Sequence, residues 1–260
     1  MAFLQVQFFS ETLRQGCSMN VILPERYHRP SEPFVQPYPV LYLLHGASDD
    51  HSAWQRNTSI EQYAAEKGIA VIMPSVQYSF YSDMKHGYDY FTYIAEELPQ
   101  IVKSFFPISE RREDTFAIGL SMGGYGAFKL GVSYPQRYAA VASLSGSLDQ
   151  RTRLEGKALF NNTVFSKQAM LTFGSYEEYV GSDNNIGQLL ERRLAEGVTM
   201  PSFYQACGTN DHNYEINQSF HEIFHNRINL LYEVESGAGH DWEFWDKYVR
   251  RAVDWLPLRK

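Results

Sequence analysis

Six short runs of mostly apolar residues constrain the fold of this 260-residue chain more than any other feature. Within each run apolar residues follow one another directly, and glycine, proline or polar residues end the run. The runs occupy positions 40–46, 69–75, 115–120, 139–146, 202–208 and 230–235. Strands buried on both faces have this composition, which is typical of parallel sheets covered by helices.

Helical patterns separate the predicted strands. Apolar residues recur at helical spacing in 91–105, 125–133, 216–224 and 242–255. Pro99 predicts a kink in the first of these helices. Over positions 3–23, alternation of apolar and polar residues predicts an antiparallel hairpin at the edge of the sheet. Strands that alternate with helices indicate an α/β fold with a mostly parallel central sheet and helices on both faces.

We expect one domain over residues 1–260, because no repeat, low-complexity tract or linker divides the chain. Residues 147–200 interrupt the alternation, since they contain short helical patterns and polar turns but no clear strand. This stretch is too long for a simple loop between two strands. We therefore predict a small cap insertion at about 147–200 that covers the carboxyl edge of the sheet.

Charge and composition argue against several classes of function. Acidic residues outnumber basic ones, giving a formal net charge of −7, and no run of lysines or arginines occurs. This balance argues against a nucleic-acid partner. No segment resembles a membrane span or a secretory signal, so we expect a cytoplasmic protein. The abundant aromatic residues could line a pocket or form an interface between copies of the chain, so the sequence leaves open whether the chain forms a homo-oligomer.

A serine between two glycines follows one of the predicted strands. The segment reads Gly119-Leu120-Ser121-Met122-Gly123, and a helical pattern begins directly after it. Gly-x-Ser-x-Gly alone is a weak signal. A strand before the serine and a helix after it are the context in which the serine lies on a tight turn as a nucleophile. We therefore predict that Ser121 is a catalytic nucleophile.

A serine nucleophile needs a base, and the base needs an acid that orients it. In this type of fold the chain order is serine, acid, histidine. His240 lies on a glycine-rich turn after the last predicted strand and is the predicted base. Asp211 follows the strand at 202–208 and is the first choice for the acid. Asp149, after the preceding strand, and Asp183, in the predicted cap, remain alternatives.

Two backbone N–H groups should bind the oxyanion that forms during acyl transfer. One should come from Met122, the residue after the predicted nucleophile. The other should come from the loop after the strand at 40–46, where we predict Ala47, with Gly46 as the alternative donor. We expect His45 to order this loop and not to act as a second base.

Aromatic residues are dense between positions 78 and 93, partly among glycine, serine and aspartate residues. Pocket lining and ordinary core packing both explain such a cluster. We expect this segment and the cap to shape the acyl and alcohol pockets. The substrate-pocket candidates are His45, Trp54, Tyr78, Tyr81 and Tyr88.

A competing motif lies on a predicted helix, where His221-Glu222-Ile223-Phe224-His225 spells His-Glu-x-x-His. In zinc peptidases this spacing places two histidine ligands on one helical face, with the glutamate as base. The extended motif with a third histidine is absent here. An apolar stripe on the same helix also fits a surface helix packed against a sheet. We therefore expect no metal, and a zinc hydrolase remains a remote alternative.

Four segments together resemble the esterase D family of α/β-hydrolases, and most of all its bacterial tributyrin-esterase branch. They read YLLHGASDDHSAW, GLSMGGYGAF, CGTNDHNYEIN and GAGHDWEFW, and they span most of the chain. The resemblance implies an α/β-hydrolase fold and a serine carboxylesterase for short acyl esters of the acetyl to butyryl type, with no cofactor. It also implies a triad of Ser121, Asp211 and His240, with Ala47 and Met122 as oxyanion donors.

The same superfamily includes S-formylglutathione hydrolases, feruloyl and acetylxylan esterases, and mycolyl transferases. Glutathione-thioester hydrolases typically carry a cysteine soon after the oxyanion-hole glycine, whereas residues 46–54 here, GASDDHSAW, contain none. S-formylglutathione and carbohydrate acetyl or feruloyl esters remain alternative substrates. A binding module without activity is a further alternative, although every member of the triad has a candidate residue.

Overall fold

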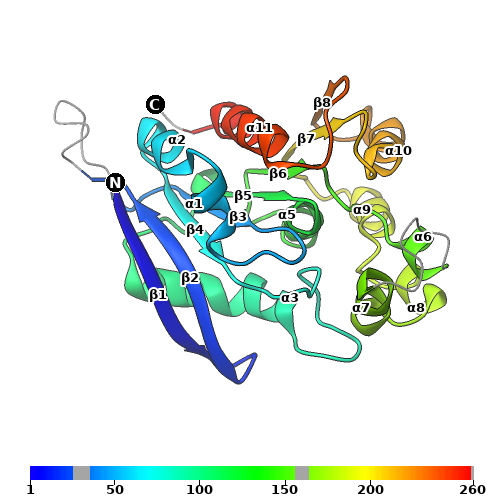
Figure 1. Cartoon of the computed structure of the whole chain (residues 1–260), viewed down its shortest axis with the longest axis horizontal. Coiled ribbons are helices and arrows are strands. Elements are labelled where there is room, and N and C mark those ends of the chain that lie inside the picture. Colours follow the sequence, from blue (N-terminus) through cyan, green and yellow to red (C-terminus); the bar gives the residue numbers. More distant parts are fainter. Residues whose placement is uncertain (26–35, 156–163, 259–260) are drawn as a thin grey trace.

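The computed structural model describes residues 1–25, 36–155 and 164–258. At its centre lies an eight-stranded sheet with the strand order β1-β2-β4-β3-β5-β6-β7-β8 (Figure 1). In chain order the strands are β1 Ala2–Ser10, β2 Gln15–Leu23, β3 Val40–Leu44, β4 Ala70–Pro74, β5 Thr115–Leu120, β6 Ala140–Leu144, β7 Ser202–Gly208 and β8 Leu230–Glu235. The six predicted strands and both strands of the predicted hairpin are present.

The N-terminal hairpin extends a parallel sheet. β1 pairs antiparallel with β2, and β2 pairs antiparallel with β4. From β4 to β8 every pair of neighbouring strands is parallel. The carboxyl ends of these parallel strands therefore meet at one edge of the sheet, where open α/β sheets bind their ligands.

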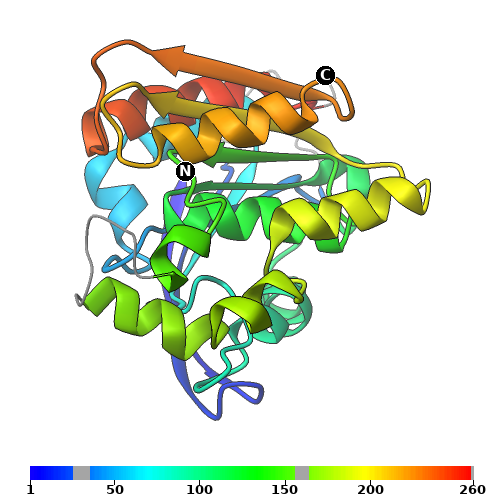
Figure 2. The same cartoon turned by 90° about the vertical axis from the view of Figure 1, so that its right-hand side faces the viewer.

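Helices cover both faces of the sheet. In chain order they are α1 Ala53–Asn57, α2 Ile60–Lys67, α3 Tyr90–Thr92, α4 Leu98–Phe105, α5 Met122–Ser133, α6 Arg151–Leu154, α7 Val164–Phe173, α8 Tyr176–Val180, α9 Ile186–Ala195, α10 Tyr214–Phe224 and α11 Trp242–Trp255. Side chains of α1, α2 and α11 form the core on one face, and those of α4, α5, α9 and α10 form the core on the other. Figure 2 shows helices on both sides of the sheet. None of the helices in the described part of the chain is long and apolar enough to span a bilayer.

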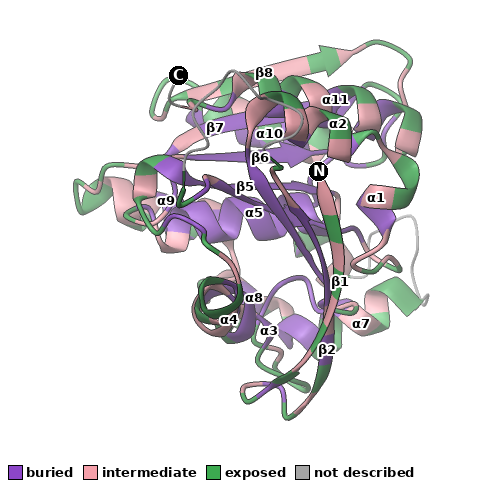
Figure 3. Ribbon diagram, turned by 90° about the vertical axis from the view of Figure 1, so that its left-hand side faces the viewer, coloured by how far each residue is buried: buried purple, intermediate pink, exposed green. Residues whose placement is uncertain are grey.

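The strands are continuously apolar because each contributes to two cores. Along β3, Val40, Tyr42 and Leu44 join the core shared with α5, whereas Leu41 and Leu43 join the core shared with α11. Successive strand residues point to opposite faces of a sheet, so both sets must be apolar. The central strands are buried along their length (Figure 3).

The last strand differs from the prediction. The run at 230–235 is a strand, as expected, but β8 pairs only with β7 and forms an edge of the sheet. Leu231 and Val234 are exposed. An edge strand lacks the second neighbour and part of the helical cover that bury a central strand, so its apolar residues are not buried on both faces.

The kink predicted at Pro99 is a change of helix type. A π-helical turn, Tyr93–Glu97, precedes α4, and Pro99 lies in the first turn of α4. Proline has no N–H to donate to the carbonyl four residues earlier. The Arg137 guanidinium donates to that carbonyl, on Ala95, at 2.8 Å. The side chain thus satisfies the acceptor that proline leaves free.

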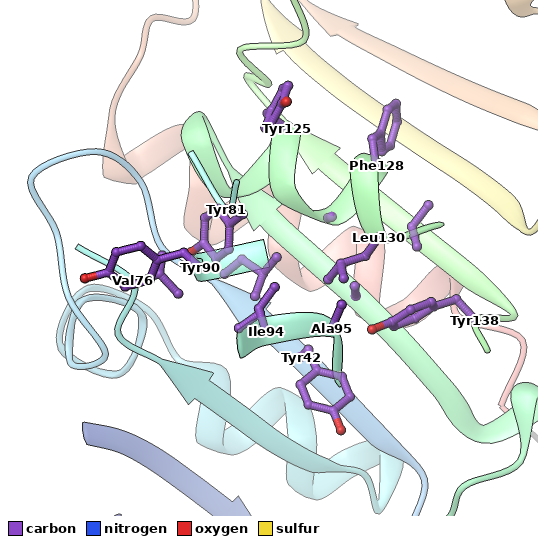
Figure 4. Close-up of a cluster of buried hydrophobic side chains, with 14 of the residues drawn as sticks. Tyr42, Val76, Tyr81, Tyr90, Ile94, Ala95, Tyr125, Phe128, Leu130 and Tyr138 are labelled. Carbon is purple, nitrogen blue, oxygen red and sulfur yellow. The ribbon is translucent and has the colours of Figure 1, made fainter. Parts of the chain in front are cut away.

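The aromatic segment at 78–93 belongs mainly to the core. Its buried aromatic residues are Phe80, Tyr81, Tyr90 and Tyr93. Figure 4 shows Tyr81 and Tyr90 in the same buried cluster as Leu130 of α5. Core packing therefore explains most of the aromatic density, while Tyr88 is exposed.

Helices α6 to α9 lie between β6 and β7 in the chain and gather on the side of the molecule next to α5 (Figure 2). The described part of 147–200 contains no strand, as predicted, although residues 156–163 of the predicted cap lie outside the description. Partly buried hydrogen bonds join this region to α5. The Lys129 ammonium donates to Asn184 Oδ1 at 2.6 Å, and the Tyr125 hydroxyl donates to the Asn184 carbonyl at 2.7 Å.

Helix α5 crosses the sheet so closely that glycine is required at its start. A Cβ on Gly119 would lie 2.2 Å from the carbonyl oxygen of Gly123, and a Cβ on Gly123 would lie 2.2 Å from the carbonyl oxygen of Leu44. Both obstacles are backbone atoms, which cannot rotate away as a side chain can. The approach of α5 to β3 therefore depends on these two missing side chains.

We predict that Gly123→Ala destabilises the protein by about 2 kcal/mol or more, because the new methyl group overpacks the contact between α5 and β3. An exposed helical glycine would instead gain stability from alanine. Urea unfolding monitored by circular dichroism measures the change. Gly187→Ala is the matched control, because Gly187 lies in helix α9 and an added Cβ there has no neighbouring atom closer than 3.6 Å. Equal stability of the two variants would contradict the prediction.

Candidate active site

Ser121 occupies a strained turn between β5 and α5. Its backbone has φ 50° and ψ −114°, a conformation that residues with a side chain rarely adopt. The Ser121 N–H donates to the carbonyl of Leu144 in the neighbouring strand at 2.8 Å. This bond and the two glycine contacts described above hold the turn, and the side chain projects into a cavity at the carboxyl edge of the sheet.

The loop that carries His240 is joined to the turn after β7 by several hydrogen bonds. The Asn210 N–H donates to the Ala238 carbonyl at 2.9 Å, and the Gly237 N–H donates to the Thr209 hydroxyl at 2.9 Å. A Cβ on Gly208 would lie 2.2 Å from the Ala238 carbonyl oxygen, so the loops touch where glycine leaves room. The two loops therefore position their side chains together.

These loops bring the three predicted triad residues into one hydrogen-bonded chain. His240 Nδ1 lies 2.8 Å from Asp211 Oδ2, and His240 Nε2 lies 3.0 Å from Ser121 Oγ. An ionised carboxylate only accepts hydrogen bonds, so Nδ1 carries the proton and donates to Asp211. Nε2 is then unprotonated and can accept the serine proton. This arrangement is the one in which a histidine acts as general base toward a serine.

The environment of Asp211 favours its ionised form. Its side chain is fully buried, which opposes ionisation, but hydrogen bonds from His240, from Ser145 and from the Asn213 N–H outweigh burial and hold the pKa of Asp211 below its usual value. The Asn213 N–H donates to Oδ1 at 2.8 Å, which leaves Oδ2 for His240. Asp211 therefore holds the imidazole in one tautomer and orientation.

The two alternative acids lie in other interactions. Asp149 accepts from the Arg151 guanidinium at 2.6 Å and from the Arg151 N–H at 2.9 Å. Asp183 pairs with Arg192. Neither has a recorded contact with His240 in the described residues, so the geometry favours Asp211 over both.

The predicted oxyanion donors lie beside Ser121. Met122 is the first residue of α5, where a helix leaves its N–H groups without an intrahelical acceptor. Across the described residues, neither the Met122 nor the Ala47 N–H has a recorded protein acceptor. Ala47, Met122 and the alternative Gly46 all line the cavity. Free N–H groups in this position suit an oxyanion.

The cavity that contains Ser121 has a volume of about 200 Å³. It is lined by Gly46, Ala47, Asp49, Tyr78, Phe80, Leu120, Ser121, Met122, Ser147, Arg153, Phe165, His212, His240 and Trp245. Phe80 belongs to the aromatic segment at 78–93 that we expected to shape the pockets, whereas Arg153 and Trp245 were not among the predicted pocket residues. His212 and Trp245 had a signal, since they follow Asp211 and His240 closely. No sequence signal pointed to Arg153, because its position depends on how α6 packs against the edge of the sheet.

Only one of the five pocket candidates lines this cavity among the described residues, namely Tyr78. Tyr88 is exposed elsewhere on the surface. The other three are buried behind the loop that carries Ala47, and each bonds to one of three successive carbonyls. His45 Nδ1 lies 2.7 Å from the Gly46 carbonyl oxygen. Trp54 Nε1 donates to the Leu44 carbonyl at 2.9 Å, and the Tyr81 hydroxyl donates to the His45 carbonyl at 3.0 Å.

These three bonds have a common physical cause. Strand β3 ends at Leu44, so the carbonyls beyond it lose their partners in the sheet while remaining buried. His45 accepts the Val76 N–H at Nε2, 3.1 Å away, so Nδ1 donates to Gly46 and the ring is neutral. Burial lowers the pKa of His45 to about 4. His45 thus orders the loop in its neutral form, because only the neutral ring can accept a hydrogen bond at Nε2 while Nδ1 donates one.

The His-Glu-x-x-His segment does not assemble a metal site in the part of the chain that the structure describes. The rings of His221, in α10, and of His225, just after its last residue, stack with centroids 4.9 Å apart, but no third ligand joins them in the described residues. The residues that do gather at ligating distance are Asp211, His212 and His240, within 4.8 Å of one another. Two of these three already belong to the hydrogen-bonded chain at Ser121.

Comparison with known proteins places the chain in a family. The Esterase family model, described as "Putative esterase", matches residues 10–256. This chain belongs to that esterase family. An acetyl esterase from Caldicellulosiruptor saccharolyticus is 32% identical over 264 residues, which cover 98% of both chains.

Two solved structures from Staphylococcus aureus resemble the esterase over 98% of both chains. The fluorophosphonate-binding serine hydrolase FphF, with substrate bound, has a TM-score of 0.88 and 32% identity. The S-formylglutathione hydrolase FrmB has a TM-score of 0.85 and 33% identity. The predicted α/β-hydrolase fold is thereby confirmed, and the chain is a hydrolase of carboxylic esters.

We predict that the esterase loses stability as the pH falls from about 6.5 to about 4, partly through His45. The folded protein keeps His45 neutral down to about 4, whereas the unfolded chain binds a proton near 6.5. The unfolded state therefore binds more protons in this range, and the free energy of unfolding falls by up to about 3 kcal/mol from this group.

Urea unfolding at a series of pH values measures this loss. His45→Gln is the comparison, because an amide oxygen can still accept the Val76 N–H but does not titrate. The free energy of unfolding of this variant should fall less between pH 6.5 and 4 than that of the original protein. If the free energy of unfolding falls equally in both proteins, His45 does not make the assigned contribution.

Proposed function

We propose that the esterase is a serine carboxylesterase in which Ser121, His240 and Asp211 act as a catalytic triad. The hydrogen-bonded chain from Asp211 through His240 to Ser121 carries this proposal. In the first half of the reaction, Ser121 Oγ attacks the carbonyl carbon while its proton moves to His240 Nε2. The C–O bond to the alcohol then breaks, and His240 returns the proton to the departing oxygen.

Water completes the second half of the reaction. His240 takes a proton from the water as its oxygen attacks the acyl-enzyme, and Ser121 leaves with that proton, releasing the carboxylic acid. In both halves the N–H groups of Ala47 and Met122 bind the oxyanion. Asp211 stabilises the imidazolium without itself being protonated. No metal or organic cofactor takes part in these steps.

We further propose short acyl esters, of the acetyl to butyryl type, as substrates, and a place in the tributyrin-esterase branch. The cavity of about 200 Å³ is smaller than the roughly 300–1,000 Å³ of typical pockets for drug-sized ligands. The relative from Caldicellulosiruptor saccharolyticus is named an acetyl esterase. A cytoplasmic location and the absence of a nucleic-acid partner remain predictions from the sequence, which leaves a homo-oligomer open.

S-formylglutathione is a second candidate substrate, which the 33% identity to the hydrolase FrmB supports equally well. A thioester needs the same nucleophile, base and oxyanion donors, so the triad geometry fits both reactions. The absence of cysteine from residues 46–54 favours the oxygen ester. Substrate measurements distinguish the two.

We predict that Ser121→Ala lowers kcat by on the order of 10^4 to 10^6 without unfolding the protein, because no other group can form the acyl-enzyme. Asp211→Asn should lower kcat by about 10^4, since the amide no longer holds the required tautomer. Asp149→Asn is the matched control and should have a far smaller effect. A larger loss of kcat in Asp149→Asn than in Asp211→Asn would assign the role of the triad acid to Asp149.

We predict that 4-nitrophenyl acetate and butyrate are hydrolysed with higher kcat/KM than the octanoate, because the small cavity does not hold a long chain.

A fluorophosphonate should abolish turnover and add its mass at Ser121, whereas EDTA should have no effect. Loss of activity to EDTA would instead implicate the His221–His225 helix. Parallel assays with S-formylglutathione test the second candidate substrate. A higher kcat/KM for this thioester than for the oxygen esters would contradict the assignment as a carboxylesterase for oxygen esters.

A further inference from the structure

A cationic side chain enters the cavity beside Ser121. Arg153, in the short helix α6, lines the cavity together with Ser147 and Phe165. Its guanidinium donates through one nitrogen to the Ser147 hydroxyl and to Gln150 Oε1, the latter at 2.8 Å. These contacts fix the side chain in position.

The position of Arg153 is coupled to the predicted nucleophile through the backbone. The Ser147 N–H donates to the Ser121 carbonyl at 3.0 Å, while the Ser147 hydroxyl accepts from Arg153. The charge also acts across the cavity, since Arg153 contributes to lowering the pKa of His212, after burial and His240. The guanidinium is thus close to the reacting groups without belonging to the triad.

Arg153 has no carboxylate partner among the described residues. Both of its hydrogen bonds go to neutral oxygens, through a single nitrogen. Asp149, four residues earlier in the chain, accepts two bonds from Arg151 and faces Arg153 only at longer range. Glu155, two residues after Arg153, makes no ion pair with it in the described part of the chain, where Arg153 donates to Ser147 and Gln150. Residues 156–163, GKALFNNT, contain no aspartate or glutamate that could serve instead.

Arg153 is partly exposed, and its partial burial makes the charge costly unless an anion joins it. Burial lowers the pKa of Arg153 although the Tyr78, Tyr179 and Asp149 side chains act in the opposite direction. Arginine nevertheless remains protonated in proteins, so the guanidinium stays charged. Buried charges are normally paired, and an arginine fork fits a carboxylate with two parallel hydrogen bonds. Its Nε and second terminal nitrogen have no recorded acceptor in the described chain.

We propose that Arg153 binds a carboxylate carried by the substrate, so that the preferred esters have an anionic group on their acyl or alcohol part. The inference rests on the proposed function, because it places the anion in a substrate whose carbonyl reaches Ser121. The other charged residue in the wall, Asp49, interacts with Asp50 and Arg56 and has no recorded interaction with Arg153. Its negative charge therefore does not replace the missing partner.

The experiment compares esters that match in shape and differ in charge. For the acyl side, 4-nitrophenyl hemisuccinate is compared with 4-nitrophenyl 4-methylpentanoate, in which an isopropyl group replaces the carboxylate. For the alcohol side, 4-acetoxybenzoate is compared with its methyl ester. The readout is the ratio of kcat/KM for the anionic over the neutral ester, measured in the original protein, Arg153→Met, Arg153→Lys and the control Arg192→Met.

Arg153→Met should lower this ratio by on the order of 10- to 100-fold on the side where the carboxylate binds, the range expected for losing a hydrogen-bonded charge. Arg153→Lys should retain part of the preference, because the charge remains but the fork is lost. Arg192→Met, which removes a guanidinium from the surface of α9, should leave the ratio within about twofold. The pair of esters whose kcat/KM ratio falls in Arg153→Met shows whether the carboxylate belongs to the acyl or to the alcohol part of the substrate.

Two results would overturn the proposal. If Arg153→Met lowers both members of each pair equally, the residue only positions Ser147 and Gln150. If the original protein has a higher kcat/KM for the neutral ester than for the anionic ester in both pairs, the cavity does not prefer a carboxylate and Arg153 does not recognise one. Ser121→Ala separates this outcome from failure of the proposed function, because it should abolish turnover of neutral and anionic esters alike.

Discussion

The contact between helix α5 and the sheet is the constraint on which the site depends. With no side chain at Gly119 or Gly123, the backbone of the helix reaches the end of β3. The chain can then turn sharply enough to hold Ser121 at φ 50°, and the turn leaves the Met122 N–H at the start of the helix. The positions of the proposed nucleophile and of one proposed oxyanion donor therefore follow from the same close packing. A larger residue at either glycine would disturb both at once.

Buried polar side chains supply the second support of the site. Where β3 ends, His45, Trp54 and Tyr81 donate to three successive carbonyls and so hold the loop that carries Ala47. On the other side of the sheet edge, hydrogen bonds join the loops of Asp211 and His240. This fixed backbone keeps the proposed oxyanion donors in place before substrate arrives, and electrostatic stabilisation of an oxyanion requires such preorganised donors.

Much of the fold could be predicted because its signals are local. Continuous apolar runs identify strands that face two cores, and the glycine-flanked serine between a strand and a helix identifies the tight turn. Ser121, Asp211 and His240 meet because each follows a strand whose carboxyl end lies at the same edge of the sheet. β8 was the exception, because the same apolar run occurs in a strand that has only one neighbour.

The sequence by itself determined the type of sheet and the residues that carry the predicted chemistry, since periodicity and motif spacing are properties of short segments. Only the tertiary structure decided which aromatic residues face the cavity. Tyr78 does so, whereas Trp54 and Tyr81 satisfy buried carbonyls, and composition cannot distinguish these two uses of a polar aromatic side chain. The tertiary structure also placed Arg153 beside Ser121, because its position depends on how α6 packs back onto the edge of the sheet and not on any pattern around it.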